Sequence, residues 1–256
     1  MKITVLGSGT SQGVPVIGCD CEVCRSIDFR DNRLRASVHV EADGLSLVID
    51  TGPDFRQQML RENILRVDAV LYTHQHKDHT GGMDDLRSYN FRQGSAIPIY
   101  GRDQVIRQLE KEFEYIFMAP EKKYPGVLNV EVHEIRNELF TVGELPVLPI
   151  DVLHVKLPVF GFRIKDFTYL TDVSHIPDSE LEKMKGTRIL ILDALQKEGH
   201  ISHLTLSQAV EIAQELNPEQ TYFTHISHKM GLHADIEAEL PENIYLAYDG
   251  LVIRTN

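Results

Sequence analysis

A seven-residue segment, 73–79, carries the histidines whose spacing best suits metal binding. Its sequence THQHKDH contains the pattern H-x-H-x-D-H and directly follows a short apolar run. His74 and His76 stand two residues apart, so an extended or turning backbone can point both imidazoles at one metal ion. Asp78 and His79 are adjacent and can reach a second ion. The segment therefore predicts a centre with two metal ions, whose chemistry is hydrolysis.

A second group of metal-binding residue types is the cysteine cluster Cys19, Cys21 and Cys24, in the pattern C-x-C-x-x-C. Three crowded thiols make a poor disulfide framework, whereas three thiolates supply three corners of a tetrahedral zinc site. The fourth ligand must come from elsewhere in the chain. We predict His228, because it follows another histidine by three residues in THISH and can be turned outward. The loop near 18–25 is thus predicted to bind a structural zinc.

These motifs resemble those of the metallo-β-lactamase-fold hydrolases, in which H-x-H-x-D-H after a strand is followed by a distant His, Asp and His. The chain continues in that order with His154, Asp172 and His225, each at the end of an apolar or aromatic run. The resemblance implies that each ion takes three side-chain ligands and that Asp172 bridges the pair. The implied ligands are His74, His76 and His154 for one ion, and Asp78, His79 and His225 for the other.

The same resemblance implies roles for residues beside the metals. Asp50, in the turn Asp-Thr-Gly, looks like the aspartate turn of the family and is expected to orient a ligand rather than bind metal. Phosphodiesterases of this fold place a non-ligand histidine in the region that reads GHISHLT here, where His203 is the better match and His200 the alternative. Such a histidine can hydrogen-bond a phosphoryl oxygen or protonate the leaving alkoxide. Asp78 is also counted among the catalytic residues.

The opening Gly-Ser-Gly-Thr at 7–10, together with C-x-C-x-x-C, resembles the phosphoribosyl cyclic phosphodiesterase family of phosphonate catabolism over essentially the whole chain. That resemblance implies two catalytic divalent ions, zinc or manganese, one structural zinc, and a homodimer interface at the zinc-tied loop. The expected reaction is phosphodiester hydrolysis, in which a water bridging the two ions loses a proton and attacks phosphorus. The expected substrate is a small phosphodiester, with cyclic sugar phosphates as candidates.

Other functions share the ligand pattern and stay open as alternatives. A thioester hydrolase and a transfer-RNA 3′-processing nuclease of the same fold use the same residues, and a non-catalytic metal-binding protein belongs to a different class. The chain has 26 Lys and Arg against 38 Asp and Glu, a net charge of −12, which repels a long polyanion more than a small anion. We therefore expect a small substrate and no long nucleic acid as partner.

The elements that must position these residues are short strands and helices in alternation, in a composition of 42% hydrophobic and 25% charged residues that suits one globular core. Helical periodicity predicts three helices, at Asp103–Phe113, Pro177–Met184 and Ser207–Leu216, the last with Ser207 as its cap. Apolar runs predict strands at Ile3–Leu6, Ser46–Ile49, Ala69–Tyr72, Ile97–Tyr100, Val127–Val132, Phe162–Ile164, Ile189–Leu192, Ile244–Ala247 and Leu251–Ile253.

This alternation, without a low-complexity linker, predicts a single α/β domain over 1–256. The resemblance makes it a metallo-β-lactamase-type αββα sandwich. His39 and His133 fall within strand-like runs and are expected to be surface histidines of strands. Only four residues, Ile3–Leu6, of which three are apolar, follow Met1-Lys2 before a glycine. This is too short an apolar stretch for a signal peptide, and no run reaches membrane-spanning length. A cytoplasmic location without membrane partners is expected.

Overall fold

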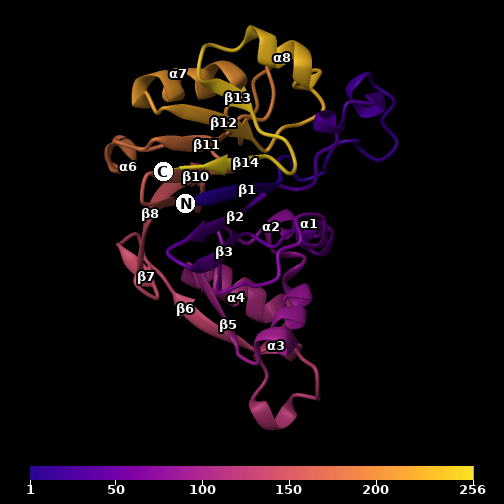
Figure 1. The fold of residues 1–256 in the computed structure, drawn as a ribbon, viewed down its shortest axis with the longest axis vertical. Coiled ribbons are helices and arrows are strands. Elements are labelled where there is room, and N and C mark those ends of the chain that lie inside the picture. Colours follow the sequence, from indigo (N-terminus) through magenta and orange to yellow (C-terminus); the bar gives the residue numbers. More distant parts are fainter. Residues whose placement is uncertain (256) are drawn as a thin grey trace. The chain divides into compact units, whose positions relative to one another are not determined.

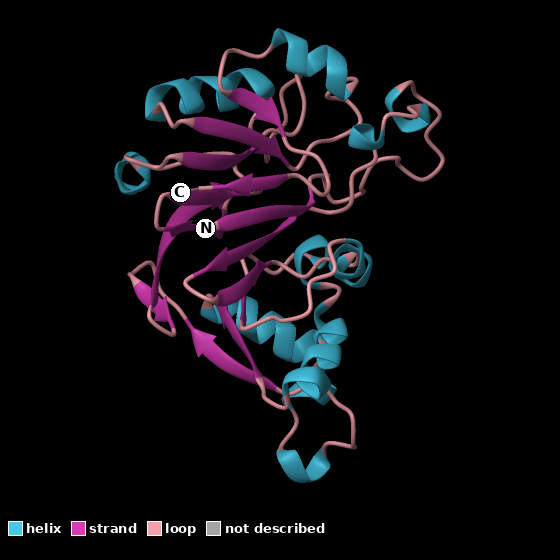
Figure 2. Ribbon diagram, in the orientation of Figure 1, coloured by secondary structure: helices cyan, strands magenta, loops and turns pink. Residues whose placement is uncertain are grey.

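The computed structural model describes residues 1–255, which form two compact units. The first unit comprises Met1–Leu6, Ser37–Arg136 and the C-terminal segment from Val252, and the second comprises Gly7–Ala36 and Asn137–Leu251. Each unit contains one seven-stranded sheet with both parallel and antiparallel pairs (Figures 1 and 2). The predicted α/β class is confirmed.

The sheet of the first unit has the strand order β14-β1-β2-β3-β4-β5-β6. From β3 to β6 neighbouring strands are parallel, whereas β2 pairs antiparallel with β3. Its strands are β1 Lys2–Gly7, β2 Ser37–Ala42, β3 Leu45–Ile49, β4 Ala69–Leu71, β5 Ile97–Gly101, β6 Val130–Glu134 and β14 Val252–Arg254. Parallel strands bring their carboxyl ends to one edge of the sheet, where polar segments follow β3 and β4.

Helices cover one face of this sheet (Figure 1). Their apolar sides, including Phe55, Leu86 and Leu109, form a core with Val70 and Ile99 of the central strands. These helices are α1 Phe55–Arg61, α2 Lys77–Thr80, α3 Arg87–Gln93, α4 Asp103–Glu112 and α5 Glu114–Phe117, with a 3-10 turn at Met83–Leu86. The predicted helix at Asp103–Phe113 is therefore confirmed to within one residue.

The sheet of the second unit has the order β13-β12-β11-β10-β9-β8-β7. Strands β7 to β10 form an antiparallel meander, and β10 to β13 are parallel. Its strands are β7 Phe140–Val142, β8 Leu145–His154, β9 Leu157–Ile164, β10 Phe167–Leu170, β11 Ile189–Asp193, β12 Gln220–Thr224 and β13 Ile244–Leu246. Here too the carboxyl ends of the parallel strands share an edge.

Three helices pack on this second sheet, α6 Asp178–Met184, α7 Leu206–Leu216 and α8 His233–Glu239. Ala209 and Ala213 of α7 and Ile236 of α8 join Leu192 and Phe223 of the sheet in one buried cluster. The short side chains of the two alanines let α7 approach the strands closely. The segment that carries the cysteines contains only two short 3-10 turns, Val23–Arg25 and Phe29–Asp31.

Several predicted boundaries differ from the structure, and two of these differences have local hydrogen-bonding reasons. The cap of α7 is Thr205 rather than Ser207, because the Thr205 hydroxyl accepts from the backbone N–H of Gln208 while the Gln208 side chain accepts from the N–H of Thr205. Strand β6 begins at Val130 rather than at Val127. The side chain of Asn90 binds both backbone groups of the preceding residue, Asn129, at 2.7 and 2.9 Å, which holds it outside the strand.

The expectation of a surface position is wrong for His39. On β2 this residue is 2% exposed, and its Nε2 lies 2.7 Å from Ser46 Oγ on β3. The alternation of apolar and polar residues fails as a guide here because successive residues of β2, on both faces of the strand, are buried. His133 on β6 is partly exposed and stacks on Tyr100, so for His133 the expected position holds.

Candidate metal and catalytic residues

The four ligands predicted in the first unit lie together at the carboxyl end of β4. His74 and His76 come from the loop after the strand, and Asp78 and His79 from α2, which begins directly after His76. The ring of His74 lies 4.5 Å from that of His76 and 4.2 Å from that of His79, and His79 Nε2 is 3.1 Å from Asp78 Oδ2. Three imidazoles and a carboxylate therefore converge, the donor types preferred by zinc and similar divalent ions.

Asp50 follows β3, is fully buried, and contacts His79 on the side of its ring opposite to Asp78. Its Oδ2 accepts a hydrogen bond from His79 Nδ1 at 2.7 Å, and the backbone N–H and hydroxyl of Thr73 donate to the same carboxylate at 2.9 and 2.8 Å. Burial raises the pKa of Asp50, against the opposing effect of these partners. Because Nδ1 of His79 is bound to Asp50, Nε2 is the ring atom presented toward Asp78, the geometry of a carboxylate that orients a metal-binding histidine.

The turn that carries Asp50 packs directly onto the segment that carries His79. The N–H of Thr51 donates to the carbonyl of His79, and the N–H of Gly82 donates to the carbonyl of Thr51, both at 2.8 Å. A Cβ at Gly82 would lie 2.2 Å from the carbonyl oxygen of Gly52. Position 82 therefore requires glycine, and this close backbone contact fixes the two segments relative to each other.

The three ligands predicted in the second unit also lie together, around Asp172. His154 ends β8, Asp172 follows β10 and His225 follows β12. The Asp172 carboxylate lies 4.0 Å from His154 Nε2, 3.4 Å from His225 Nε2 and 4.0 Å from Nε2 of His203. The carbonyl of Ser202 accepts from His154 Nδ1 at 2.8 Å, which turns the opposite nitrogen toward Asp172.

Three residues of the predicted site have a left-handed backbone conformation, which residues other than glycine rarely adopt. The φ angle is 65° at Asp50, 57° at Asp172 and 60° at His225. Each such position costs about 1 kcal/mol or more and persists only where the surrounding structure imposes it. All three come within two residues after the end of a strand. The strained backbone therefore occurs where a polar side chain lies at the edge of a sheet. This pattern is typical of functional sites.

Asp193, the last residue of β11, was not predicted as a site residue and is fully buried. Its carboxylate accepts from Nδ1 of His203 at 3.2 and 3.3 Å, and from the N–H groups of Leu204 and Val173. Because Nδ1 of His203 is hydrogen-bonded to Asp193, the other ring nitrogen of His203, Nε2, faces Asp172. The sequence contained one signal for this residue: Asp193 closes an apolar run, as Asp50 and Asp172 do.

The two candidates for the acid histidine differ in their surroundings. His203 is 8% exposed, oriented by Asp193, and stacked on His225 with ring centroids 4.6 Å apart. His200 is exposed, and its Nδ1 lies 3.0 Å from the hydroxyl of Ser202. Partial burial and the neighbouring charge of His203 lower the pKa of His200. The geometry favours His203, because only this histidine is fixed by a carboxylate and directed toward a predicted ligand.

The predicted zinc ligands of the cysteine loop come together within the second unit. The Sγ atoms of Cys19, Cys21 and Cys24 lie 3.3, 3.4 and 3.5 Å from Nδ1 of His228. The backbone N–H of Cys24 lowers the pKa of Cys21 to about 6, whereas burial raises that of Cys24 to about 11. Three sulfur atoms and one imidazole nitrogen at these separations fit the four corners of a tetrahedral zinc site.

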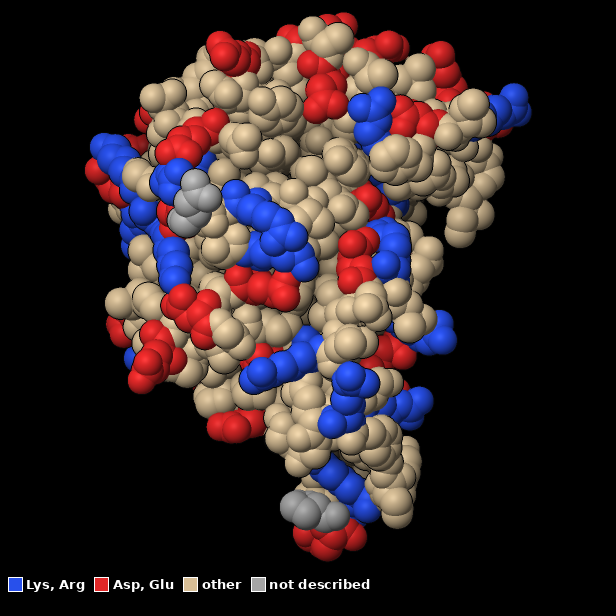
Figure 3. Space-filling model, in the orientation of Figure 1, with Lys and Arg blue, Asp and Glu red and all other residues tan. Residues whose placement is uncertain are grey.

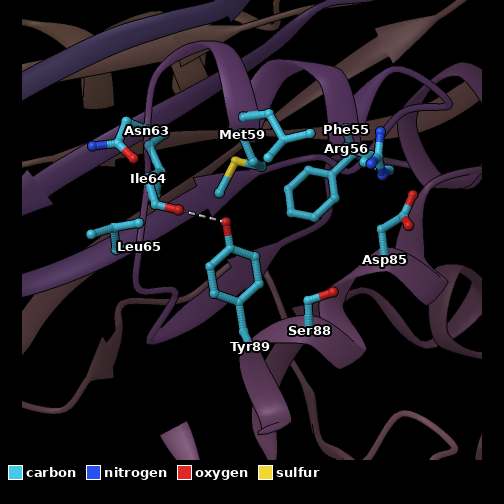
Figure 4. A pocket seen from close by; sticks show the side chains of 10 residues that line it. Phe55, Arg56, Met59, Asn63, Ile64, Leu65, Asp85, Ser88 and Tyr89 are labelled. Carbon is cyan, nitrogen blue, oxygen red and sulfur yellow. Dashed lines mark hydrogen bonds between the residues drawn. The ribbon is translucent and has the colours of Figure 1, made fainter. Parts of the chain in front are cut away.

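A cavity of about 260 Å³ in the first unit lies apart from all predicted site residues (Figure 4). Phe55, Met59 and Ile64 supply its apolar wall, and the hydroxyl of Tyr89 donates to the carbonyl of Ile64 at 2.8 Å. Arg56, Asp85 and Ser88 lie at its polar side. None of the predicted ligands lines this cavity, and it plays no part in the function proposed below.

A family model described as β-lactamase superfamily domain matches residues 46–226, which contain all seven predicted catalytic ligands. The chain belongs to the β-lactamase superfamily. The resemblance to metallo-β-lactamase-fold hydrolases is thereby confirmed. A superfamily member whose solved structure is described as a new diphosphatase from the PhnP family is 43% identical, covers 100% of this chain and 98% of its own, and has a TM-score of 0.92.

The chain is also similar to a curated protein, an octanoyltransferase of Porphyromonas gingivalis, with which it is 38% identical over 254 residues. The match covers 98% of this chain but 51% of that protein, so the chain spans about half the length of this relative. Zinc-bound PqqB of Methylobacterium extorquens, with a TM-score of 0.79 and 19% identity over the whole of both chains, shares the fold. The predicted fold class, α/β of the metallo-β-lactamase type, is confirmed, and the structure adds that its two sheets are both mixed.

Proposed function

We propose that this protein is a metal-dependent phosphodiesterase that hydrolyses small phosphodiesters. The observation that carries the proposal is the likeness to the PhnP-family diphosphatase, at 43% identity across the whole chain. Diphosphate and phosphodiester hydrolysis both replace an oxygen on phosphorus with that of water, so both call for the same metal-assisted chemistry. Membership of a metallo-hydrolase superfamily and the His and Asp groups in each unit support the same reaction class.

The metallo-β-lactamase fold generally binds divalent metals, and the donor types in this chain fit such ions. We propose two catalytic ions, zinc or manganese, since imidazole and carboxylate ligands accept either. The proposed ligands are His74, His76 and His154 for one ion, Asp78, His79 and His225 for the other, and Asp172 for both. When bound, the metals supply an activated water and neutralise charge on the phosphoryl oxygens.

The protein's own groups orient these ligands and move the proton. Asp50 fixes the ring of His79, and the carbonyl of Ser202 fixes that of His154. His203 is proposed to give the proton to the leaving oxygen, with His200 as the alternative donor. Asp193 would position His203 through its contact with Nδ1.

We further propose that the cysteine cluster holds one structural zinc through four protein ligands, which leaves no position for substrate. Ile17 and Ile27, almost fully exposed on the same loop, support the proposal of a homodimer interface there. Among residues 1–255, no helix is long and apolar enough to cross a membrane. Reduced, metal-binding thiols suit a reducing compartment, which supports the proposed cytoplasmic location.

A small substrate is favoured over nucleic acid by charge. On the face drawn in Figure 3, basic side chains are interspersed with acidic ones, and the net charge is −12. A long polyanion needs an extended array of Lys and Arg to neutralise its phosphates. Thioester hydrolysis and transfer-RNA processing remain the alternatives within the fold.

A substrate panel tests the proposal. Protein loaded with manganese or zinc is given a chromogenic phosphodiester, a ribose cyclic phosphate, precursor transfer RNA and an acyl-glutathione thioester, with Asp172→Ala as the inactive control. We expect the small phosphodiesters to be cleaved fastest. Rapid thioester cleavage with inert phosphodiesters would overturn the reaction class, and faster cleavage of transfer RNA would overturn the preference for small substrates. No turnover at all would favour a non-catalytic metal-binding protein.

A further inference from the structure

A cavity of about 260 Å³ in the second unit opens beside the proposed acid, His203. Its walls come from three separate segments of the chain, represented by Gln12, Gln196 and Lys229. Leu195 is the single apolar residue among those that line it. A polar cavity next to a proton donor is suited to a polar part of the substrate rather than to an apolar one.

Backbone hydrogen bonds hold the three walls together. The N–H of Thr10 donates to the carbonyl of Ile226, and the N–H of Ile226 donates to the carbonyl of Ser8. The N–H of Ser227 donates to the carbonyl of Leu195, at 2.9 Å. The cavity is therefore built on fixed segments, one of which directly follows the predicted ligand His225.

Lys229, an exposed residue, is the one Lys or Arg among the residues that line this cavity. No Asp or Glu is found among its lining residues, and the Lys229 ammonium makes no ion pair with any residue of 1–255. The nearby Lys197 differs, because its ammonium lies 2.9 Å from Glu239.

We propose that Lys229 is a specificity-determining residue that binds an anionic group, phosphate or carboxylate, on the leaving part of the substrate. The inference rests on the proposed phosphodiesterase function. In the hydrolysis, the oxygen of water forms a new bond to phosphorus and gives up one proton to solvent. The bond from phosphorus to the leaving oxygen breaks, and that oxygen takes a proton from His203, which solvent then reprotonates. The leaving part must therefore lie at His203. The cavity beside His203 is where the rest of that group extends, and an unpaired ammonium there favours an anion.

The test compares three methyl phosphodiesters that differ only in the leaving nitrophenol: unsubstituted, carrying a carboxylate, or carrying a phosphate. For Lys229→Met we expect KM to rise about tenfold or more for the two anionic substrates, the loss of one charge-assisted hydrogen bond, with kcat within about twofold. KM for the unsubstituted ester should not change. The matched control is Lys197→Met, which removes a paired lysine nearby and should leave all three KM values unchanged. The larger of the two increases identifies phosphate or carboxylate as the preferred group.

Equal KM changes for all three esters, or none, would overturn the role of Lys229 while leaving the phosphodiesterase intact. Failure of the wild-type protein to cleave any ester would instead count against the proposed function. In that case inorganic phosphate is titrated calorimetrically into wild-type and Lys229→Met protein stripped of exchangeable metals. Weaker binding to the variant would support the anion site, and equal binding to both would overturn it.

Discussion

The burial of His39 should make the folded protein less stable as the pH falls below 7, because the unfolded chain takes up a proton on this histidine and the folded protein does not. The Ser46 hydroxyl donates its single hydrogen to the carbonyl of Arg66, so it must accept from Nε2 of His39. His39 is therefore neutral with its proton on Nε2, and its buried Nδ1 has no hydrogen-bond partner among residues 1–255. A second proton would have to sit on Nδ1 without an acceptor. Burial accordingly lowers the pKa of His39 to about 4, from 6.5.

The size of the effect follows from these two pKa values. In the unfolded chain His39 takes up a proton as the pH falls through about 6.5, whereas the folded protein resists protonation until about 4. The contribution of neutral His39 to the free energy of unfolding is thus complete above pH 6.5 and is lost as the pH falls toward 4. Its full size is about 3 kcal/mol, of which about 2 kcal/mol is lost by pH 5. That is a large fraction of the 5–15 kcal/mol typical of a folded protein.

Urea unfolding at pH 7 and pH 5 measures this loss in wild type and in His39→Gln. The glutamine amide keeps a donor toward Ser46 but cannot titrate, so the variant should lose about 2 kcal/mol less than wild type between the two pH values. The other histidines cancel in this difference. Equal losses in the two proteins would refute the reasoning, as would an NMR titration in which the His39 ring gains its second proton near pH 6.5.

Three further perturbations test the site and the fold. His203→Ala should keep its metals and lose rate by about 10²–10⁴-fold, as expected for a positioned acid; wild-type activity in this variant together with impaired His200→Ala would move the role to His200. Cys21→Ser and His228→Ala should each lose about one equivalent of zinc by elemental analysis and unfold at a lower temperature; full zinc content in His228→Ala would show that the fourth ligand lies elsewhere. Gly161→Ala should destabilise the second unit by several kcal/mol in urea unfolding. A Cβ at this position would lie 1.9 Å from the Leu170 side chain and 2.7 Å from the Tyr169 carbonyl. A loss below about 1 kcal/mol would show that β9 and β10 shift apart at little cost and would contradict this prediction.

The amino-acid sequence alone determined the chemistry of the predicted metal sites. Residue type and close spacing are enough to define donor sets such as H-x-H-x-D-H or C-x-C-x-x-C, because neighbours in sequence are necessarily neighbours in space. Apolar runs likewise predicted most strands, and their ends marked Asp50, Asp172 and His225 as candidates. The residues that could be proposed as ligands from the sequence are therefore those marked by local pattern and position.

Only the tertiary structure decided which distant groups meet. His228 was predicted from the sequence as a partner of the cysteines, and the structure brings its Nδ1 to 3.3 Å from Cys19 Sγ, across 209 positions of the chain. Asp193, which orients His203, was not predicted, because the two residues meet only where β11 and the loop before α7 lie together. Burial was equally invisible: His39 alternates like a surface residue but is covered on both faces of its strand. Each of these depends on strand order and packing, which connect segments far apart in the chain, and local sequence constrains such long-range contacts only weakly.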